Sequence, residues 1–181
     1  MDGFLNQPAT YYIAQFFGLL VTAGVIISLQ LKKKTQMQTV SVFVNIFSAL
    51  NILLLEGFNS GVIVCCVAVV QLLLSIMHEI KNTKVTLAEK IIFLVLYVAG
   101  GLLGVKVPLD LLSTVAAVFY MIAVFQKKEQ NVRLFLLANM SAWTIYHAVI
   151  GSTAIFAQIA GIISSLIALF RYRKNNKKST D

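Results

Sequence analysis

Seven apolar stretches follow one another along the chain, and each is long enough to cross a lipid bilayer as a helix. Crossing about 30 Å of hydrocarbon takes about 20 mostly apolar residues. The alternation of apolar and polar residues that is typical of barrel strands is absent, so we expect helices. The predicted spans are Tyr11–Leu29, Gln36–Leu55, Gly61–Met77, Leu87–Val105, Leu109–Phe125, Val132–Ile150 and Thr153–Phe170.

The composition agrees with a polytopic membrane protein of the all-α class. Of the 181 residues, 59% are hydrophobic and 12% are charged, and the mean hydropathy is +0.84. Soluble domains are about 25% charged, so the soluble globular and disordered classes are excluded. The two cysteines, Cys65 and Cys66, are adjacent and provide no disulfide framework. The first span is too long for the core of a signal peptide, so we expect it to be retained.

Basic residues lie almost entirely on one side of a seven-span topology. Seven spans put the termini on opposite sides, and all but Lys106 of the 15 Lys and Arg residues then share the side of the C-terminus. The positive-inside rule assigns that side to the cytoplasm and predicts an N-out, C-in orientation. The residues on that side are Lys32, Lys33, Lys34, Lys81, Lys84, Lys90, Lys127, Lys128, Arg133, Arg171, Arg173, Lys174, Lys177 and Lys178.

A shift of 94 residues aligns the first three spans with the last three without a gap, placing Asn45 on Asn139 and Gly57 on Gly151. This predicts a 3+1+3 parallel internal repeat within a single transmembrane domain. That arrangement resembles the SWEET-type transporters, in which the substrate pocket lies between the two three-helix units. The predicted parts of the domain (1–181) are a first three-helix unit (11–80), a linker helix (87–105), a second three-helix unit (109–172) and a basic cytoplasmic tail (173–181).

One segment of the chain carries a family resemblance. Ile145-Tyr146-His147, followed by Gly151-Ser152 and an apolar helix that ends in Arg171-Tyr172-Arg173, resembles the YgjV-type bacterial inner-membrane proteins. The layout is similar over nearly the whole chain, whereas the sequence is similar mainly around Asn139–Arg173. It departs from the family at Tyr146 and in its short tail. The resemblance implies a multi-pass protein of the bacterial inner membrane and assigns no activity.

Asn45 and Asn139 are the first candidates for a binding site. Each lies near the middle of its span, and the repeat makes them a pseudosymmetric pair. An asparagine amide offers two donors and an acceptor oxygen, which suits a neutral polar or zwitterionic solute. The alternative is that both residues form hydrogen bonds between helices and hold the bundle together.

Three further candidates lie on the sixth span. Trp143 and Tyr146 follow Asn139 on one helical stripe, and His147 lies at the edge of that stripe. Aromatic rings in this position could stack on a solute or form the aromatic belt of the membrane interface. His147 is either a packing residue or a pH-sensitive gate.

The remaining polar and small residues are expected to have structural roles. Glu56 and Asp110 lie at span ends, so we expect hydrated boundary residues. Gly100 and Gly104 form a small-xxx-small pattern, which indicates that another helix packs closely there.

No motif in the sequence predicts an enzyme. A phosphate-binding glycine loop, a metalloprotease motif and a nucleophile elbow are absent, and the two histidines lie at opposite membrane boundaries. We therefore expect no catalytic residue, no metal and no cofactor. The positive charge is explained by orientation, so we expect no nucleic-acid partner. The expected partners are the lipid bilayer and a small solute, and the oligomeric state stays open.

Two functions remain. The first is a transporter of a small polar or neutral solute, with Asn45, Asn139, Trp143, Tyr146 and His147 as candidate substrate-binding residues. The second is a non-transporting accessory or assembly protein of the membrane. The near absence of ionisable residues at membrane depth argues against proton-driven transport.

Overall fold

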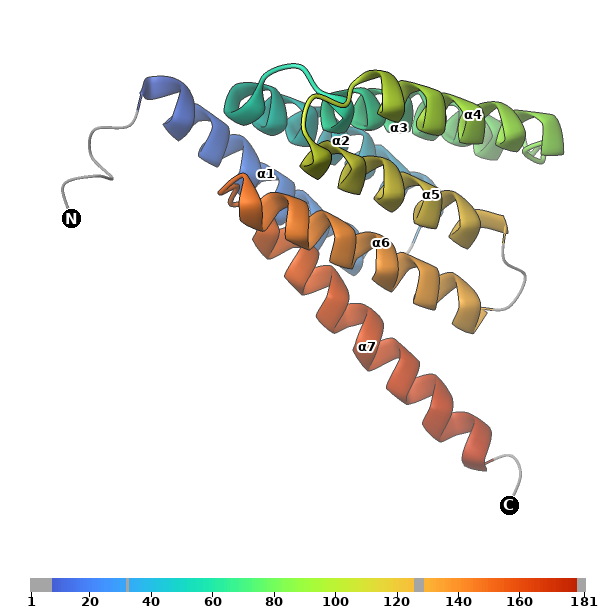
Figure 1. Ribbon diagram of the computed structural model, residues 1–181. Helices are drawn as coiled ribbons and strands as arrows, with labels where there is room; N and C mark the ends of the chain where they lie inside the picture. The colour runs from blue at the N-terminus through green and yellow to red at the C-terminus, as the bar shows by residue number, and fades with distance from the viewer. Residues whose placement is uncertain (1–7, 32, 126–128, 179–181) are drawn as a thin grey trace.

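The fold is a bundle of helices, seen in a computed structural model that describes residues 8–31, 33–125 and 129–178 (Figure 1). Within these ranges the backbone forms seven α-helices, one short 3-10 helix and no strand, which confirms the all-helical prediction. The elements are α1 (Ala9–Gln30), α2 (Lys34–Glu56), α3 (Ser60–Ile80), α4 (Leu87–Leu103), η1 (Pro108–Asp110), α5 (Leu111–Phe125), α6 (Glu129–Val149) and α7 (Ile155–Lys178).

Three of these helices are long and apolar enough to cross a bilayer by length and composition. They are α1, α2 and α3, with apolar stretches at Ala9–Ser28, Thr35–Glu56 and Ser60–Ile80. Shorter apolar stretches lie at Pro108–Ala123, Leu134–Val149 and Ile155–Ile167. Large apolar side chains such as Phe16, Phe43 and Leu103 point outward and are exposed on the bundle surface, as expected for a surface in contact with lipid.

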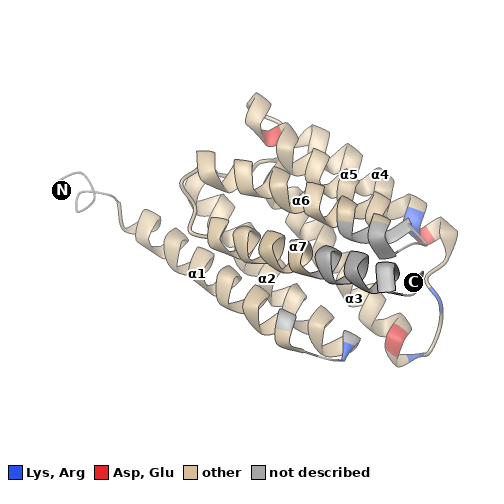
Figure 2. Cartoon of the chain, turned by 90° about the horizontal axis from the view of Figure 1, so that it is seen from below, with Lys and Arg blue, Asp and Glu red and all other residues tan. Residues whose placement is uncertain are grey.

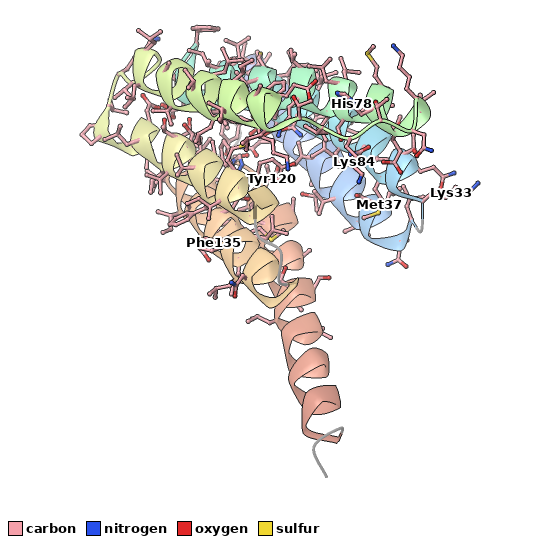
Figure 3. The ribbon with its side chains drawn as sticks, turned by 90° about the vertical axis from the view of Figure 1, so that its right-hand side faces the viewer. Lys33, Met37, His78, Lys84, Tyr120 and Phe135 are labelled. Carbon is pink, nitrogen blue, oxygen red and sulfur yellow. The ribbon has the colours of Figure 1, made fainter. Side chains whose placement is uncertain are left out.

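The helices pack as two sets of three joined by α4. In the first set α2 contacts both α1 and α3, and in the second α6 contacts both α5 and α7. The sets meet where α1 contacts α7 and where α3 contacts α5, and α4 lies against α3 and α5. The last turns of α7 stand clear of α6, as Figures 1 and 3 show.

The two ends of the bundle differ in charge. One end, called here the lysine-rich end, carries Lys33, Lys81, Lys84 and Lys90 in or beside the α1–α2 and α3–α4 connections. Figure 2 shows the basic segments gathered away from the N-terminus. The opposite end, called the Asp110 end, contains the α2–α3, α4–η1 and α6–α7 connections and Lys106. Lys32, Lys127 and Lys128 lie outside the described residues.

Two glycines make the sharp turns at the Asp110 end. Gly57 ends α2 with φ +75°, and Gly151 follows α6 with φ +66°. Glycine populates positive φ without the steric cost that a Cβ brings. These turns let α3 and α7 begin within a few residues of the ends of α2 and α6, which brings the starts of α3 and α7 to the same end of the bundle.

Gly104 permits the close approach of α4 to α3. A Cβ placed on Gly104 would lie 2.5 Å from the backbone nitrogen of Ser60 and 2.6 Å from its Cα. One turn earlier, a Cβ on Gly100 would meet only a side-chain atom, the γ2 methyl group of Ile63, at 2.8 Å. The packing role expected of this glycine pair is confirmed.

We therefore expect Gly104→Ala to destabilise the protein more than Gly100→Ala does. At Gly104 the added Cβ overlaps two backbone atoms of Ser60, so α3 and α4 must separate, which should cost about 1–3 kcal/mol. At Gly100 the overlap is with a single side-chain methyl group, which a smaller shift relieves. Thermal unfolding of the two variants in the same detergent measures the difference. Equal melting temperatures would contradict the close approach at Gly104.

Candidate functional site

A cavity of about 230 Å³, the central cavity, lies in the middle of the bundle. Its polar lining consists of amide and hydroxyl side chains, and three aromatic side chains complete it. No charged side chain is among the lining residues. The side chains that matter below are Asn45 from α2, Gln71 from α3, Tyr97 from α4, Tyr120 from α5, Asn139 and Trp143 from α6 and Gln158 from α7.

The two asparagines of the cavity are held in different ways. Asn45 Nδ2 donates to the carbonyl oxygen of Ser41, one turn earlier in the same helix, at 2.8 Å. Asn139 Nδ2 donates across helices to the carbonyl oxygen of Ala116 in α5, at 2.7 Å. Asn139 therefore joins α6 to α5 while it lines the cavity, whereas Asn45 makes no bond to another helix within the described residues.

Gln71 and Tyr97 fix the wall of the cavity between α3 and α4. The Tyr97 hydroxyl donates to Gln71 Oε1 at 2.6 Å, and Gln71 Nε2 lies 3.6 Å from the sulfur of Met121. Tyr97 is almost wholly buried in a cluster with Phe93 and Met121. Both side chains are thus positioned by packing and by each other.

A larger hollow of about 680 Å³, the vestibule, lies at the lysine-rich end. Its rim includes Asn82–Val85, which are exposed, so it opens at that end. Gln71, Leu72 and Tyr120 line both the vestibule and the central cavity. The two hollows therefore adjoin, and Figure 3 shows Tyr120 between His78 and Lys84 on one side and Phe135 on the other.

Charged and polar groups gather in the vestibule. His78 Nε2 lies 2.8 Å from Glu89 Oε1, and His78 Nδ1 lies 2.7 Å from the Thr83 hydroxyl. Glu89 also accepts from the backbone N–H of Thr86, in the capping box that begins α4. These bonds tie the α3–α4 connection to the first turn of α4 and shape the rim.

The Asp110 end is closed by a buried hydrogen-bond network around Asn59, called the Asn59 network. Asn59 Nδ2 donates to Asp110 Oδ1 at 2.9 Å and to the Tyr146 hydroxyl at 2.8 Å, and Asn59 Oδ1 accepts from the Val62 N–H as the cap of α3. Ser60 Oγ donates to the Asp110 carbonyl and lies 2.7 Å from Ser113 Oγ. This network joins the starts of α3 and α5 to α6.

Asp110 is only 2% exposed, so the expectation of a hydrated boundary residue was wrong for it. Its carboxylate Oδ2 accepts from the backbone N–H groups of Lys106 and Val107 at 2.9 and 3.1 Å. With Asn59, three N–H donors replace water around the carboxylate. Proteins bury a carboxylate only where such donors compensate its lost hydration. Glu56 is exposed, as expected.

A second buried network, the Asn51 network, closes the same end where α1 and α2 meet the start of α7. Asn51 Nδ2 donates to the Ala14 carbonyl at 2.7 Å, and the Ser152 hydroxyl donates to Asn51 Oδ1 at 2.6 Å. Thr153 donates to Gln15 through both its N–H (2.8 Å) and its hydroxyl (2.7 Å). Asn51 was not singled out in the sequence because the repeat aligns it with the apolar Ile145.

Tyr146 and His147 lie beside the cavity rather than in its lining. Tyr146 is fully buried and belongs to the Asn59 network. His147 is 1% exposed, and neither of its ring nitrogens has a hydrogen-bond partner within the described residues. Its ring stacks on Trp143 with centroids 5.5 Å apart, so it supports the wall of the cavity from behind.

Of the five candidate residues, the structure brings Asn45, Asn139 and Trp143 together around one cavity. Four further polar or aromatic residues of the lining were not among the candidates: Gln71, Tyr97, Tyr120 and Gln158. Counting along each span could have shown that these residues lie at the depth of the cavity. It could not have shown that they face the cavity, because the face of a helix that meets it follows only from packing.

Neighbouring substitutions at Tyr146 and His147 should have opposite effects on stability. Tyr146→Phe leaves one N–H of Asn59 buried without a partner, which costs about 1–3 kcal/mol. His147→Phe removes two buried nitrogens without partners while it keeps a ring against Trp143, so the melting temperature should not fall. Parallel thermal melts compare the two. A larger fall in melting temperature for His147→Phe than for Tyr146→Phe would contradict this and would indicate that His147 makes a hydrogen bond.

Comparison with known protein families gives a match over most of the chain. The model of the family Imp-YgjV, described as a bacterial inner membrane protein, matches residues 12–176. No curated protein and no solved structure matches the chain.

Proposed function

The chain belongs to the Imp-YgjV family of bacterial inner membrane proteins, and from this premise we propose that it transports a small, polar, uncharged solute across that membrane. The seven helices act as seven spans, and the central cavity is the binding site. The observation that carries the proposal is the adjoining pair of hollows, with an opening at the lysine-rich end and the Asn59 and Asn51 networks at the Asp110 end.

The proposed topology is N-out, C-in. The lysine-rich end then faces the cytoplasm, in agreement with the positive-inside rule, and the structure corresponds to a state open to the cytoplasm. The Asn59 and Asn51 networks form the closed outer side. Hydrogen bonds between side chains suit a gate, because they can be exchanged for water when the helices separate.

Several features support a 3+1+3 repeat as the basis of transport. The contact of α1 with α7 corresponds to that of α5 with α3 when the two units are exchanged. Gly57 and Gly151, which the shift of 94 residues aligns, are the described glycines with positive φ. Each unit places one asparagine in the cavity. Rocking one unit against the other would open the outer networks and close the vestibule.

The alternative, a non-transporting accessory or assembly protein, is favoured by one contact. Asn139 donates to the α5 backbone, as a residue that only holds helices together would do. Under this alternative the cavity admits no solute, and substitution of its lining changes stability alone.

Solute flux separates the two functions. Proteoliposomes with the purified chain should swell in an isosmotic gradient of an uncharged solute such as xylitol faster than empty liposomes do.

Asn45→Ala should slow this flux about five- to tenfold, the factor expected for one lost hydrogen bond, because Asn45 lines the cavity without holding another helix. Thr39→Ala is the matched control, since Thr39 is exposed on the same helix and also bonds the carbonyl one turn earlier. Equal swelling with and without the chain, over a panel of uncharged solutes, would overturn transport.

Cysteine labelling tests the orientation. In a chain with Cys65→Ala and Cys66→Ala, a membrane-impermeant maleimide should label Thr83→Cys only in inverted membrane vesicles. It should label Lys106→Cys only in intact spheroplasts. The two positions are exposed at opposite ends of the bundle. Labelling of both from the same side would contradict the proposed topology, and the reversed pattern would make it N-in.

A further inference from the structure

We propose that the central cavity selects a small uncharged molecule by the hydrogen bonds that this molecule donates, with a primary amide or a polyol as its chemical class. The inference rests on the proposed function and names the substrate class of the same cavity. Three observations carry it: the direction of the two asparagine amides, the absence of charge from the lining, and the volume.

The two asparagine amides have a fixed direction. A backbone carbonyl can only accept a hydrogen bond, so Asn45 and Asn139 must each turn the amide nitrogen toward the carbonyl that it contacts. The amide oxygen of each asparagine is therefore the atom that remains available to a ligand. Within the described residues, neither Asn45 Oδ1 nor Asn139 Oδ1 accepts a hydrogen bond, so both are acceptors without a donor.

The other polar side chains of the cavity do not supply those donors. The Tyr97 hydroxyl is engaged with Gln71 Oε1, and Gln71 Nε2 with the sulfur of Met121. The Ser41 hydroxyl donates to the Met37 carbonyl, and Ser48 and Cys65 bond each other. Tyr120 and Gln158 make no hydrogen bond in the described part of the chain, and each can either donate or accept. The two asparagine oxygens are thus fixed acceptors, beside two groups that adapt. A ligand that fits must bring donors, because an acceptor buried against an apolar group loses its hydration without compensation.

The ligand is uncharged because the cavity has no counter-charge for it. No Lys, Arg, His, Asp or Glu is among the lining residues, and in the adjoining vestibule His78 and Glu89 already pair. A charge moved into such a site would lose its hydration without gaining an ion partner. The charged rim of the vestibule remains hydrated, so it does not add a preference for charged ligands.

The volume limits the ligand to a small molecule. The cavity of about 230 Å³ equals about eight water molecules at ~30 Å³ each. Trp143 and Tyr120 add flat apolar surface to the lining, on which a ring can lie. A ring bearing one primary amide and a ring of hydroxyl groups share the required chemistry, and both are of this size.

Trp143 makes the test direct, because it is the single tryptophan of the chain and lines the cavity. The full chain in detergent is titrated with four transparent ring compounds of similar size while tryptophan fluorescence is followed. Cyclohexanecarboxamide is uncharged and donates two N–H bonds, and its N,N-dimethyl derivative donates none. Cyclohexanecarboxylate is an anion and cyclohexylmethylammonium a cation. A fifth probe, myo-inositol, distinguishes the polyol class from the amide class.

We expect a saturable change with cyclohexanecarboxamide or with myo-inositol, and binding of the other three that is at least about tenfold weaker. Asn45→Ala should weaken binding of the responding probe about five- to tenfold, the effect of one neutral hydrogen bond, and Thr39→Ala should leave it unchanged. Equal or tighter binding of the dimethyl amide or of either ion would overturn the inference, as would the absence of a saturable response to both donor probes.

These outcomes separate the inference from the proposed function. A response to an ion that Asn45→Ala weakens would leave the cavity as a solute site and reject only the donor class. Solute flux in the swelling experiment without a response to either donor probe would do the same. Saturable binding of a donor probe without any flux would keep the donor class and reject transport.

Discussion

The arrangement of this bundle depends on Asn59. Its side chain donates both amide hydrogens, one to Asp110 and one to Tyr146, while its oxygen caps α3. These groups are buried away from water, so the carboxylate is compensated only by hydrogen bonds within the protein. One side chain therefore fixes the starts of α3 and α5 and the end of α6 together. At the lysine-rich end, residues of α3, α4 and α5 line the vestibule instead.

The two units of the bundle are similar in layout and different in how they are held. Asn45 bonds within its own helix, whereas Asn139 ties α6 to α5. The Asn59 network includes a carboxylate, whereas the Asn51 network consists of amide, hydroxyl and backbone groups. Breaking a bond to a charged group costs more than breaking a neutral one. The two contacts between the units therefore differ in kind: the α3–α5 contact includes a bond to a carboxylate, whereas the α1–α7 contact is held by several neutral bonds.

The sequence predicted the helices well because span length and the bounding polar residues are local properties. It also predicted that Asn45 and Asn139 lie at similar depth, since depth follows from counting along a helix. It could not place Tyr146 and His147, because one step along a helix turns a side chain by about 100° and only packing decides which face meets the cavity. The burial of Asp110 escaped prediction because its partner Asn59 lies 51 residues away in the sequence.

The length of α7 has a mechanical consequence. The helix has 24 residues, which at 1.5 Å per residue makes a rod of about 36 Å, and its last turns stand clear of α6 (Figure 1). Its first turn follows directly on Ser152 and Thr153, which hold Asn51 and Gln15. A rod held at one end and free at the other is a lever. A tilt imposed on the C-terminal turns, by the lipid surface or by a bound protein, would be transmitted to the α1–α7 contact at the far end without passing through the cavity.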